Sequence, residues 1–284
     1  MAVKANPTVL RRQLGWALRR IREREQLTVA ESAGRLGWSE SKLSRIETAN
    51  SGVRRNDLER LLDTYDIGEP ERARIIALAS QAEQRNWWEA YGNALPDSYE
   101  AFIGFEAEAT SIFTYQAQLI PGLLQTAEYA RATMRTLVVT RPEAVEERLV
   151  VRLGRQKVLT REPPPEFWAV LDEAVLRRQV GEPGVMRRQL LRLVEVADGP
   201  SVTVQVHPFA AGVHRGMEGS FVILEFAGGA DSSLVYLEGM TGGVFRHQPA
   251  ELRSYLMSFE SLRATALSPA ESLDFIRTLA DSTV

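Results

Sequence analysis

The chain has 284 residues and a formal net charge of −3; 44% of its residues are hydrophobic, 25% are charged and none is cysteine. This composition is typical of a globular protein with one large or two ordinary domains, and it excludes disulfides, thiolate nucleophiles and cysteine-ligated zinc. The sequence has no run of 18 apolar residues and no apolar signal-peptide core, so we expect a cytoplasmic protein that binds no membrane.

The charge is unevenly spread along the chain. Residues 1–65 hold 13 Lys and Arg against 8 Asp and Glu, a net charge of +5, whereas the remainder holds 21 against 29, a net charge of −8. A basic N-terminal part on an acidic body suggests that only the N-terminal part meets a polyanion such as DNA. Chance asymmetry is the alternative, because many acidic proteins carry basic patches.

Residues 7–26 are predicted to form the first helix. Leu14, Leu18 and Ile21 follow i, i+4, i+7 spacing and form an apolar stripe along it. The surrounding arginines are Arg11, Arg12, Arg19, Arg20, Arg22 and Arg24. Together with neighbouring glutamates, we expect these arginines to form mostly a solvated face.

A short second helix is predicted at residues 29–36. Thr28 suits the N-cap of this helix, and Glu31 at its third position completes a capping box. Gly37 suits a helix end that needs a left-handed residue. Another capped helix follows at once, and this order of elements predicts a helix-turn-helix.

Residues 39–47 are predicted to form the recognition helix. Ser39 suits its N-cap, and Leu43 and Ile46, three residues apart, can face inward together. The other faces carry polar side chains that suit insertion into the major groove of DNA. The residues expected to contact DNA are Thr28, Ser39, Glu40, Ser41, Lys42, Ser44, Arg45, Arg54 and Arg55.

Most of these residues have a specific expected contact. Glu40 can accept a hydrogen bond from a cytosine amino group, and Lys42 and Arg45 can reach guanine or phosphate. Thr28 and Ser39 can hold phosphates. The arginine pair before the next helix can also meet a phosphate, although a plain surface pair is the alternative.

Two further helices are predicted before the body begins. Residues 53–62 carry an apolar stripe that closes the small bundle, and residues 70–85 form the next helix. Trp87, Trp88 and Tyr91 follow. Adjacent tryptophans cannot both enter one core from one helix, so these three residues are candidates for a ligand or partner contact. Ordinary packing against the body is the alternative.

Several segments of this N-terminal part resemble the XRE (Cro-type) helix-turn-helix family. They are Leu27-Thr28, Ala33, Leu36-Gly37, Ser39 and Leu43-Ser44-Arg45-Ile46-Glu47. The resemblance implies a homodimer that binds paired half-sites of a double-stranded DNA operator. Three residues depart from the family pattern: Val29 where glutamine is common, Ser32 where leucine is usual, and Trp38 where a smaller apolar residue is usual.

The body is predicted to be α+β. Strands are expected at residues 167–171, 201–206, 220–226 and 233–237, and helices at residues 142–160, 183–197, 249–265 and 269–280. We therefore expect a multi-domain chain. It has an all-α helix-turn-helix domain at residues 1–68, a helical linker at residues 69–98, and an α+β domain at residues 99–284 with a small, mostly antiparallel sheet.

The body also resembles an uncharacterised C-terminal domain that follows XRE readers in many actinobacterial regulators, including those of the WhiJ type. The segments that carry this resemblance are Ile120–Thr126, Tyr129–Arg131, Arg155-Gln156, Val170–Leu176 and Ala266–Pro269. It implies a transcriptional regulator that is often encoded beside a small partner protein and is sometimes described as antitoxin-like.

The loop at residues 206–220 is the remaining candidate site. His214 and Arg215, with three glycines nearby, can form a ligand or phosphate loop, and a plain connection with surface histidines is the alternative. The histidine spacing matches no standard metal motif, and no catalytic or nucleotide-binding motif is found. We therefore expect no catalytic residues, no bound metal and no cofactor.

These observations predict a sequence-specific DNA-binding transcriptional regulator, a repressor whose body receives a signal from a small protein partner. One alternative is a one-component regulator that senses a small molecule through the 206–220 loop and the tryptophan pair. The other is the antitoxin of a toxin–antitoxin-like pair.

Overall fold

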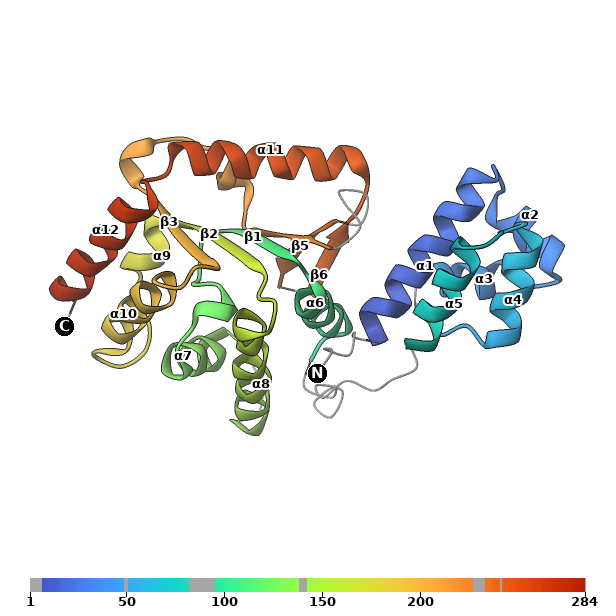
Figure 1. Cartoon of the computed structure of the whole chain (residues 1–284). Helices are drawn as coiled ribbons and strands as arrows, with labels where there is room; N and C mark the ends of the chain where they lie inside the picture. The colour runs from blue at the N-terminus through green and yellow to red at the C-terminus, as the bar shows by residue number, and fades with distance from the viewer. Residues whose placement is uncertain are drawn as a thin grey trace. The chain divides into compact units, whose positions relative to one another are not determined.

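The computed structural model describes residues 7–48, 51–81, 95–137, 142–226, 233–240 and 242–283. The chain divides into two compact units, residues 1–90 and residues 91–284 (Figure 1). Over the described residues, no helix is both long enough and apolar enough to cross a membrane.

The N-terminal unit is a bundle of short helices. They are α1 (Pro7–Arg24), α2 (Val29–Leu36), α3 (Glu40–Glu47), α4 (Arg55–Thr64) and α5 (Glu71–Gln81). The ends of the first three lie within two residues of the predicted ones, and the stripe of Leu14, Leu18 and Ile21 is buried as expected. Ile75 of α5 lies in the same core, so the segment predicted as a linker begins with a helix that belongs to this bundle.

The C-terminal unit alternates helices and strands. Its α-helices are α6 (Asp97–Glu108), α7 (Ala127–Leu137), α8 (Pro142–Arg155), α9 (Glu173–Arg177), α10 (Val185–Ala197), α11 (Pro249–Thr265) and α12 (Pro269–Ser282). Its strands are β1 (Ser111–Gln116), β2 (Glu166–Asp172), β3 (Val202–His207), β4 (Phe221–Glu225), β5 (Leu234–Gly239) and β6 (Gly242–Arg246). Short 3-10 turns are η2 (Gly122–Leu124), η3 (Gln156–Thr160), η4 (Phe209–Ala211) and η5 (Arg215–Glu218).

The sheet corrects the prediction of a small, mostly antiparallel one. It has six strands in the order β3-β2-β1-β4-β5-β6, with β1, β2 and β3 parallel and the remaining pairs antiparallel. The parallel half follows from the connections, because α7 and α8 lie between β1 and β2, and α9 and α10 lie between β2 and β3. A crossover of that length with helices is what parallel neighbours need.

Strand β6 is not predicted from the sequence, because it begins with two glycines, which weaken the residue pattern of a strand. One of these glycines has a packing role in the strand. A Cβ atom on Gly243 would lie 2.0 Å from a ring carbon of Tyr236, so the tyrosine ring occupies the space that a side chain would take.

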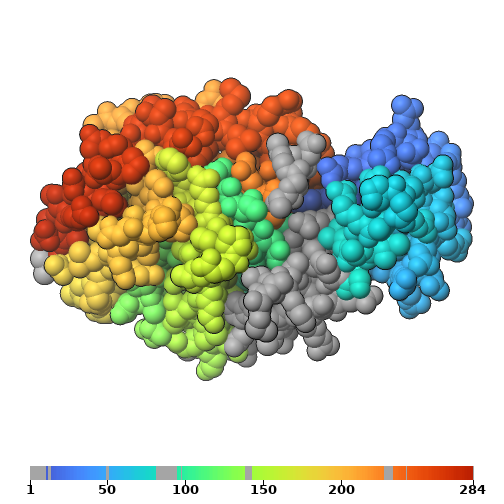
Figure 2. Space-filling model, in the orientation of Figure 1, coloured from blue at the N-terminus to red at the C-terminus, as the bar shows by residue number. Residues whose placement is uncertain are grey.

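Helices cover both faces of the sheet (Figure 1). Helix α11 packs on one face, where Phe259 and Leu262 meet Tyr115, Val170 and Val235 in a buried cluster. Helices α6, α7 and α8 lie on the opposite face. Figure 2 shows α11 and α12 in red on the surface of this unit.

Candidate nucleic-acid interface

Helix α3 has one apolar face and one polar face. The Ser39 hydroxyl caps it by accepting a hydrogen bond from the Lys42 amide at 3.2 Å. Leu43 and Ile46 are buried, as the sequence predicts. The exposed residues of the helix and its cap are Ser39, Glu40, Ser41, Ser44 and Arg45. Five of the expected DNA contacts therefore share one accessible surface, which an eight-residue helix can present to the major groove.

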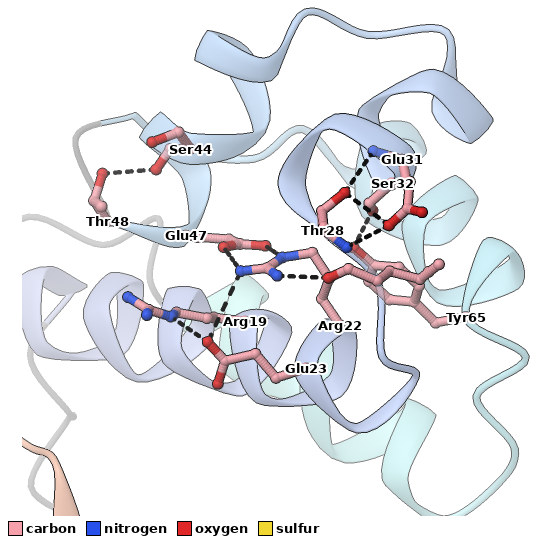
Figure 3. A network of polar contacts seen from close by, with 11 residues as sticks. Arg19, Arg22, Glu23, Thr28, Glu31, Ser32, Ser44, Glu47, Thr48 and Tyr65 are labelled. Atoms are coloured by element: carbon pink, nitrogen blue, oxygen red, sulfur yellow. Dashed lines mark hydrogen bonds and ion pairs between the residues drawn. The ribbon is translucent and has the colours of Figure 1, made fainter.

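A buried ion pair fixes the end of α3 to α1 (Figure 3). Arg22 donates from Nε and Nη2 to the two carboxylate oxygens of Glu47, at 2.7 and 2.8 Å. Its remaining Nη1 donates to the Leu27 carbonyl at 2.8 Å. The hydrogen bond from Arg22 to Glu47 raises the pKa of the guanidinium above its ordinary value. A planar fork that meets both oxygens fixes orientation as well as distance, so α1 sets the direction of α3.

Arg11, Arg20 and Arg24 of α1 are exposed, in line with the expectation of a mostly solvated face, and Arg22 is the exception. Its side chain is only 8% exposed. Helical periodicity contains the missing signal, because Arg22 continues the spacing of Leu14 and Leu18 by four more residues onto the buried face. An arginine on an apolar stripe needs a buried counter-ion, and Glu47 lies 25 residues further along the chain.

A glycine brings α1 and α3 together at the same place. A Cβ atom on Gly15 would lie 2.5 Å from the Glu47 carbonyl oxygen and 2.8 Å from the Ile46 carbonyl oxygen. Both contacts are with backbone, which cannot move aside without shifting a helix. Gly15 is therefore required for the close approach that the ion pair then fixes.

Lys42 points toward α4. Its Nζ donates to Asp57 at 2.9 Å and lies 4.0 Å from the centre of the Trp38 ring. A lysine held by a carboxylate and an aromatic face must give up both contacts to reach a base or a phosphate. Lys42 is therefore a brace between α3 and α4 in this structure, and its expected DNA contact competes with that brace.

The hydroxyl and the amide of Thr28 are already hydrogen-bonded in the cap of α2. Its hydroxyl and its amide both donate to the Glu31 carboxylate, at 2.7 and 2.8 Å, and its hydroxyl accepts from the Glu31 amide. These hydrogen bonds, first the one from the Thr28 backbone, lower the pKa of Glu31. A carboxylate at this cap disfavours a phosphate. Ser39 has no such carboxylate three residues further along the chain, so its hydroxyl is better placed to donate a hydrogen bond to a DNA phosphate.

A second polar contact holds α2 in the bundle. Ser32 is fully buried and shares a short hydrogen bond with the Tyr65 hydroxyl (Figure 3). In addition, Arg60 donates to the carbonyl of Leu36 at 2.8 Å, at the end of α2. The turn between α2 and α3 thus lies between two helices that are each tied to α4.

The arginine pair before α4 is exposed, as expected. Arg54 precedes the helix and makes no side-chain cap, whereas Arg55 pairs with Glu59 at 3.1 Å while remaining 78% exposed. Arg45 and Arg54 form no ion pair with the described residues. These two arginines are thus the predicted cations that can meet DNA without breaking an ion pair.

Two of the candidate ligand or partner residues, His214 and Arg215, lie within the described residues. Trp87, Trp88 and Tyr91 lie outside the described residues. Arg215 is exposed, whereas the His214 ring packs 4.1 Å from the centre of the His207 ring, and its Nε2 lies 3.4 Å from Asp172. The alternative of surface histidines is therefore wrong for these two. In the described parts of the chain, no group of three histidine or carboxylate side chains is arranged to hold a metal ion.

Two protein families match the chain. A helix-turn-helix domain matches residues 13–75, and a domain of unknown function, DUF5753, matches residues 99–278. No curated protein and no solved structure matches it. The N-terminal match supports an XRE-like helix-turn-helix that binds DNA and acts in transcription regulation. Because the second match covers more than half of the chain, the protein belongs to the DUF5753 family.

Proposed function

We propose that this protein is a sequence-specific DNA-binding regulator that represses transcription as a homodimer. The observation that supports this best is the exposed polar face of α3, held in a fixed direction by the Arg22–Glu47 pair. A reader helix must be oriented before binding, because base contacts require defined geometry. Repression and dimerisation follow the resemblance to XRE readers, which bind paired half-sites.

Arg45 is the residue on which we place most of the base reading. It is exposed on α3 and forms no ion pair with the described residues. Ser41 and Glu40 can contribute from the first turn, and Ser39 can hold the adjacent phosphate. A bidentate arginine contact to guanine contributes about 1–3 kcal/mol of discrimination. Arg45→Ala should therefore weaken binding to the preferred duplex roughly tenfold or more.

The test uses duplex DNA selected by the full chain from a random pool, with binding measured across a range of salt. Arg74→Ala is the matched control, because Arg74 is an exposed arginine on α5, away from the reader helix. The affinity of the wild-type chain should fall steeply with salt. An unchanged affinity in a folded Arg45→Ala variant, or failure to select any duplex, would contradict the proposal.

Lys42 requires a separate experiment, since it can act as a reader or as a brace. Asp57→Asn releases Lys42 from its ion pair without removing the lysine. If Lys42 reads DNA, Lys42→Ala should weaken binding while Asp57→Asn preserves or tightens it. If Lys42 only braces α3 against α4, both substitutions should weaken binding alike.

We further propose that the body is a binding module that receives a signal from a small protein, and that the chain is not an enzyme. The acidic excess of residues 66–284 supports this. So do three exposed apolar side chains in and between η4 and η5: Phe209, Val213 and Met217 are 57%, 92% and 67% exposed. Apolar side chains that gather on a surface are typical of interaction sites. Copurification of the chain with the protein product of an adjacent gene tests this proposal. The variant in which Phe209, Val213 and Met217 are all replaced by serine should no longer copurify with that partner.

A further inference from the structure

A cavity of about 80 Å³ lies in the C-terminal unit, where α6 and α8 cover the sheet. Its walls come from segments far apart in the sequence. They include Tyr99, Phe102, Thr114, Gln116, Arg152 and Arg155. A single water molecule needs roughly 10–15 Å³ of such space, so the cavity can take a ligand of about five to eight non-hydrogen atoms.

The cavity is separate from the histidine cluster of the 206–220 loop. Successive side chains of a strand point to opposite faces of its sheet. In β1, Thr114 and Gln116 line the cavity, whereas Tyr115 packs with the α11 cluster and contacts His214. The sheet itself therefore lies between the two places.

Arg152 is the unusual group in the cavity wall. Its Nη1 donates to the Gln125 side chain at 3.1 Å, but its Nε is buried and has no hydrogen-bond partner in the described structure. Leaving a buried donor without a partner is unfavourable, and more so when the group is charged. Among the described residues, no carboxylate lies within ion-pair distance of Arg152.

The fold makes room for this guanidinium. A Cβ atom on Gly122 would lie 2.8 Å from Nη1 of Arg152, so the arginine lies directly over the glycine backbone. Gln156 holds the same loop by donating to the carbonyls of Gly122 and Gln125 at 3.1 and 2.7 Å. The segments Ile120–Thr126 and Arg155-Gln156, which carry part of the family resemblance of the body, thus meet around Arg152.

The neighbouring arginine is different, because its charge is already neutralised. Arg155 donates from Nε and Nη2 to both carboxylate oxygens of Glu106, at 2.8 and 2.7 Å, and also donates to the Tyr99 hydroxyl. Both members of this ion pair are buried. Arg152 is therefore the cation of the described cavity wall that has no counter-ion within ion-pair distance, because Glu106 pairs with Arg155 and Glu238, the other carboxylate of the wall, forms no ion pair with Arg152. Aromatic side chains and the Thr114 and Gln116 side chains lie in the same wall.

We propose that this cavity binds a small organic monocarboxylate, whose carboxylate group pairs with Arg152 and whose short apolar part lies against Phe102. A guanidinium fork matches a carboxylate in shape. A phosphate dianion would bring a second charge that no unpaired cation of the described cavity wall compensates. This binding site goes beyond the proposed DNA-binding function and does not depend on it.

The test uses the full chain without DNA, so its failure is distinct from failure of the DNA-binding proposal. Ligand-detected NMR measures binding of acetate, propionate, butyrate and hexanoate, each paired with its neutral amide. The acids should bind with an affinity that rises with chain length until the cavity is filled, and the amides should bind at least about tenfold more weakly. No binding of any acid at about 10 mM, or equal binding of acid and amide, overturns the proposal.

Arg152→Gln should reduce butyrate binding about tenfold or more, and Arg152→Lys should restore it only in part, because lysine lacks the fork. Arg192→Gln is the control and should bind like the wild type, since Arg192 pairs with Glu195 on the surface of α10. If Arg152→Gln does not fold, the comparison of acid with amide on the wild-type chain decides. Undiminished binding by a folded Arg152→Gln variant, or binding of inorganic phosphate alone, overturns the assignment.

Discussion

Glu47→Gln tests whether a buried ion pair positions the reader helix. Glutamine keeps the shape of the side chain but removes its charge, so the buried Arg22 guanidinium keeps only Glu23 as a counter-ion, at 4.0 Å and on a side chain that is 50% exposed. The Arg22 and Glu47 side chains are 8% and 4% exposed, which gives solvent little access to screen the loss. Breaking a buried pair costs about 3–5 kcal/mol, a large part of the roughly 5–15 kcal/mol that stabilises a domain.

Hydrogen–deuterium exchange is the suitable assay, because it reports the two units of the chain separately. Peptides from residues 14–48 should lose protection corresponding to about 3–5 kcal/mol in the Glu47→Gln variant. Peptides from the sheet of the C-terminal unit should not change. Affinity for the selected duplex should fall as well, because α3 loses the contact that fixes its direction.

Two comparison variants decide whether burial is the cause. Glu59→Gln removes the surface ion pair between Glu59, which is 39% exposed, and Arg55, which is 78% exposed. This loss should cost less than about 0.5 kcal/mol of stability. The double variant Arg22→Met, Glu47→Leu replaces both charges by apolar groups and should recover most of the stability. A loss below about 1 kcal/mol for Glu47→Gln would refute the reasoning, because that is the value of a solvated pair.

Three further predictions follow from single positions. Gly15→Ala should destabilise the N-terminal unit by about 1–3 kcal/mol in urea unfolding, whereas Gly34→Ala, with nothing within 4 Å of its Cβ, should stabilise it slightly. Ser32→Ala should cost about 1–3 kcal/mol by leaving the buried Tyr65 hydroxyl unpaired, and adding Tyr65→Phe should recover most of it. Burial, and then the neighbouring histidine, lower the pKa of His207, so the unfolded chain takes up this proton first as pH falls. The neutral His207 therefore makes its full contribution to the unfolding free energy of the C-terminal unit above about pH 6.5, and this free energy should decline below that pH. His207→Gln should flatten this pH dependence in urea unfolding.

The helix-turn-helix could be predicted because its signals are local. The caps at Thr28 and Ser39 and the left-handed Gly37 each act within four residues, and all three have the predicted geometry. The partners that orient the helices could not be predicted in the same way. Arg22 meets Glu47 across 25 residues, and Lys42 meets Asp57 across 15, so these pairs exist only after the helices pack.

The C-terminal unit shows the same limit at a larger scale. Most strands could be predicted from apolar runs, but the place of β1 between β2 and β4 depends on pairings across more than 50 residues, as between Ile112 and Phe167. The cavity cannot be predicted from the sequence for the same reason, since α6, β1 and α8 meet only in the folded sheet. Glycines and histidines favoured the 206–220 loop instead, yet there His207 and His214 pack against each other.

The departures from the XRE pattern have structural partners, which changes how the reader should be understood. Val29 packs against the core of the bundle, and Ser32 bonds Tyr65 beyond the end of α4. Trp38 supplies the ring over which Lys42 reaches Asp57. Each unusual residue thus strengthens packing within the bundle, and two of them draw polar groups toward α4. If base reading falls to the exposed face of α3, with Arg45 as its cation, as we propose, the chain should prefer an operator different from those of readers that follow the usual pattern.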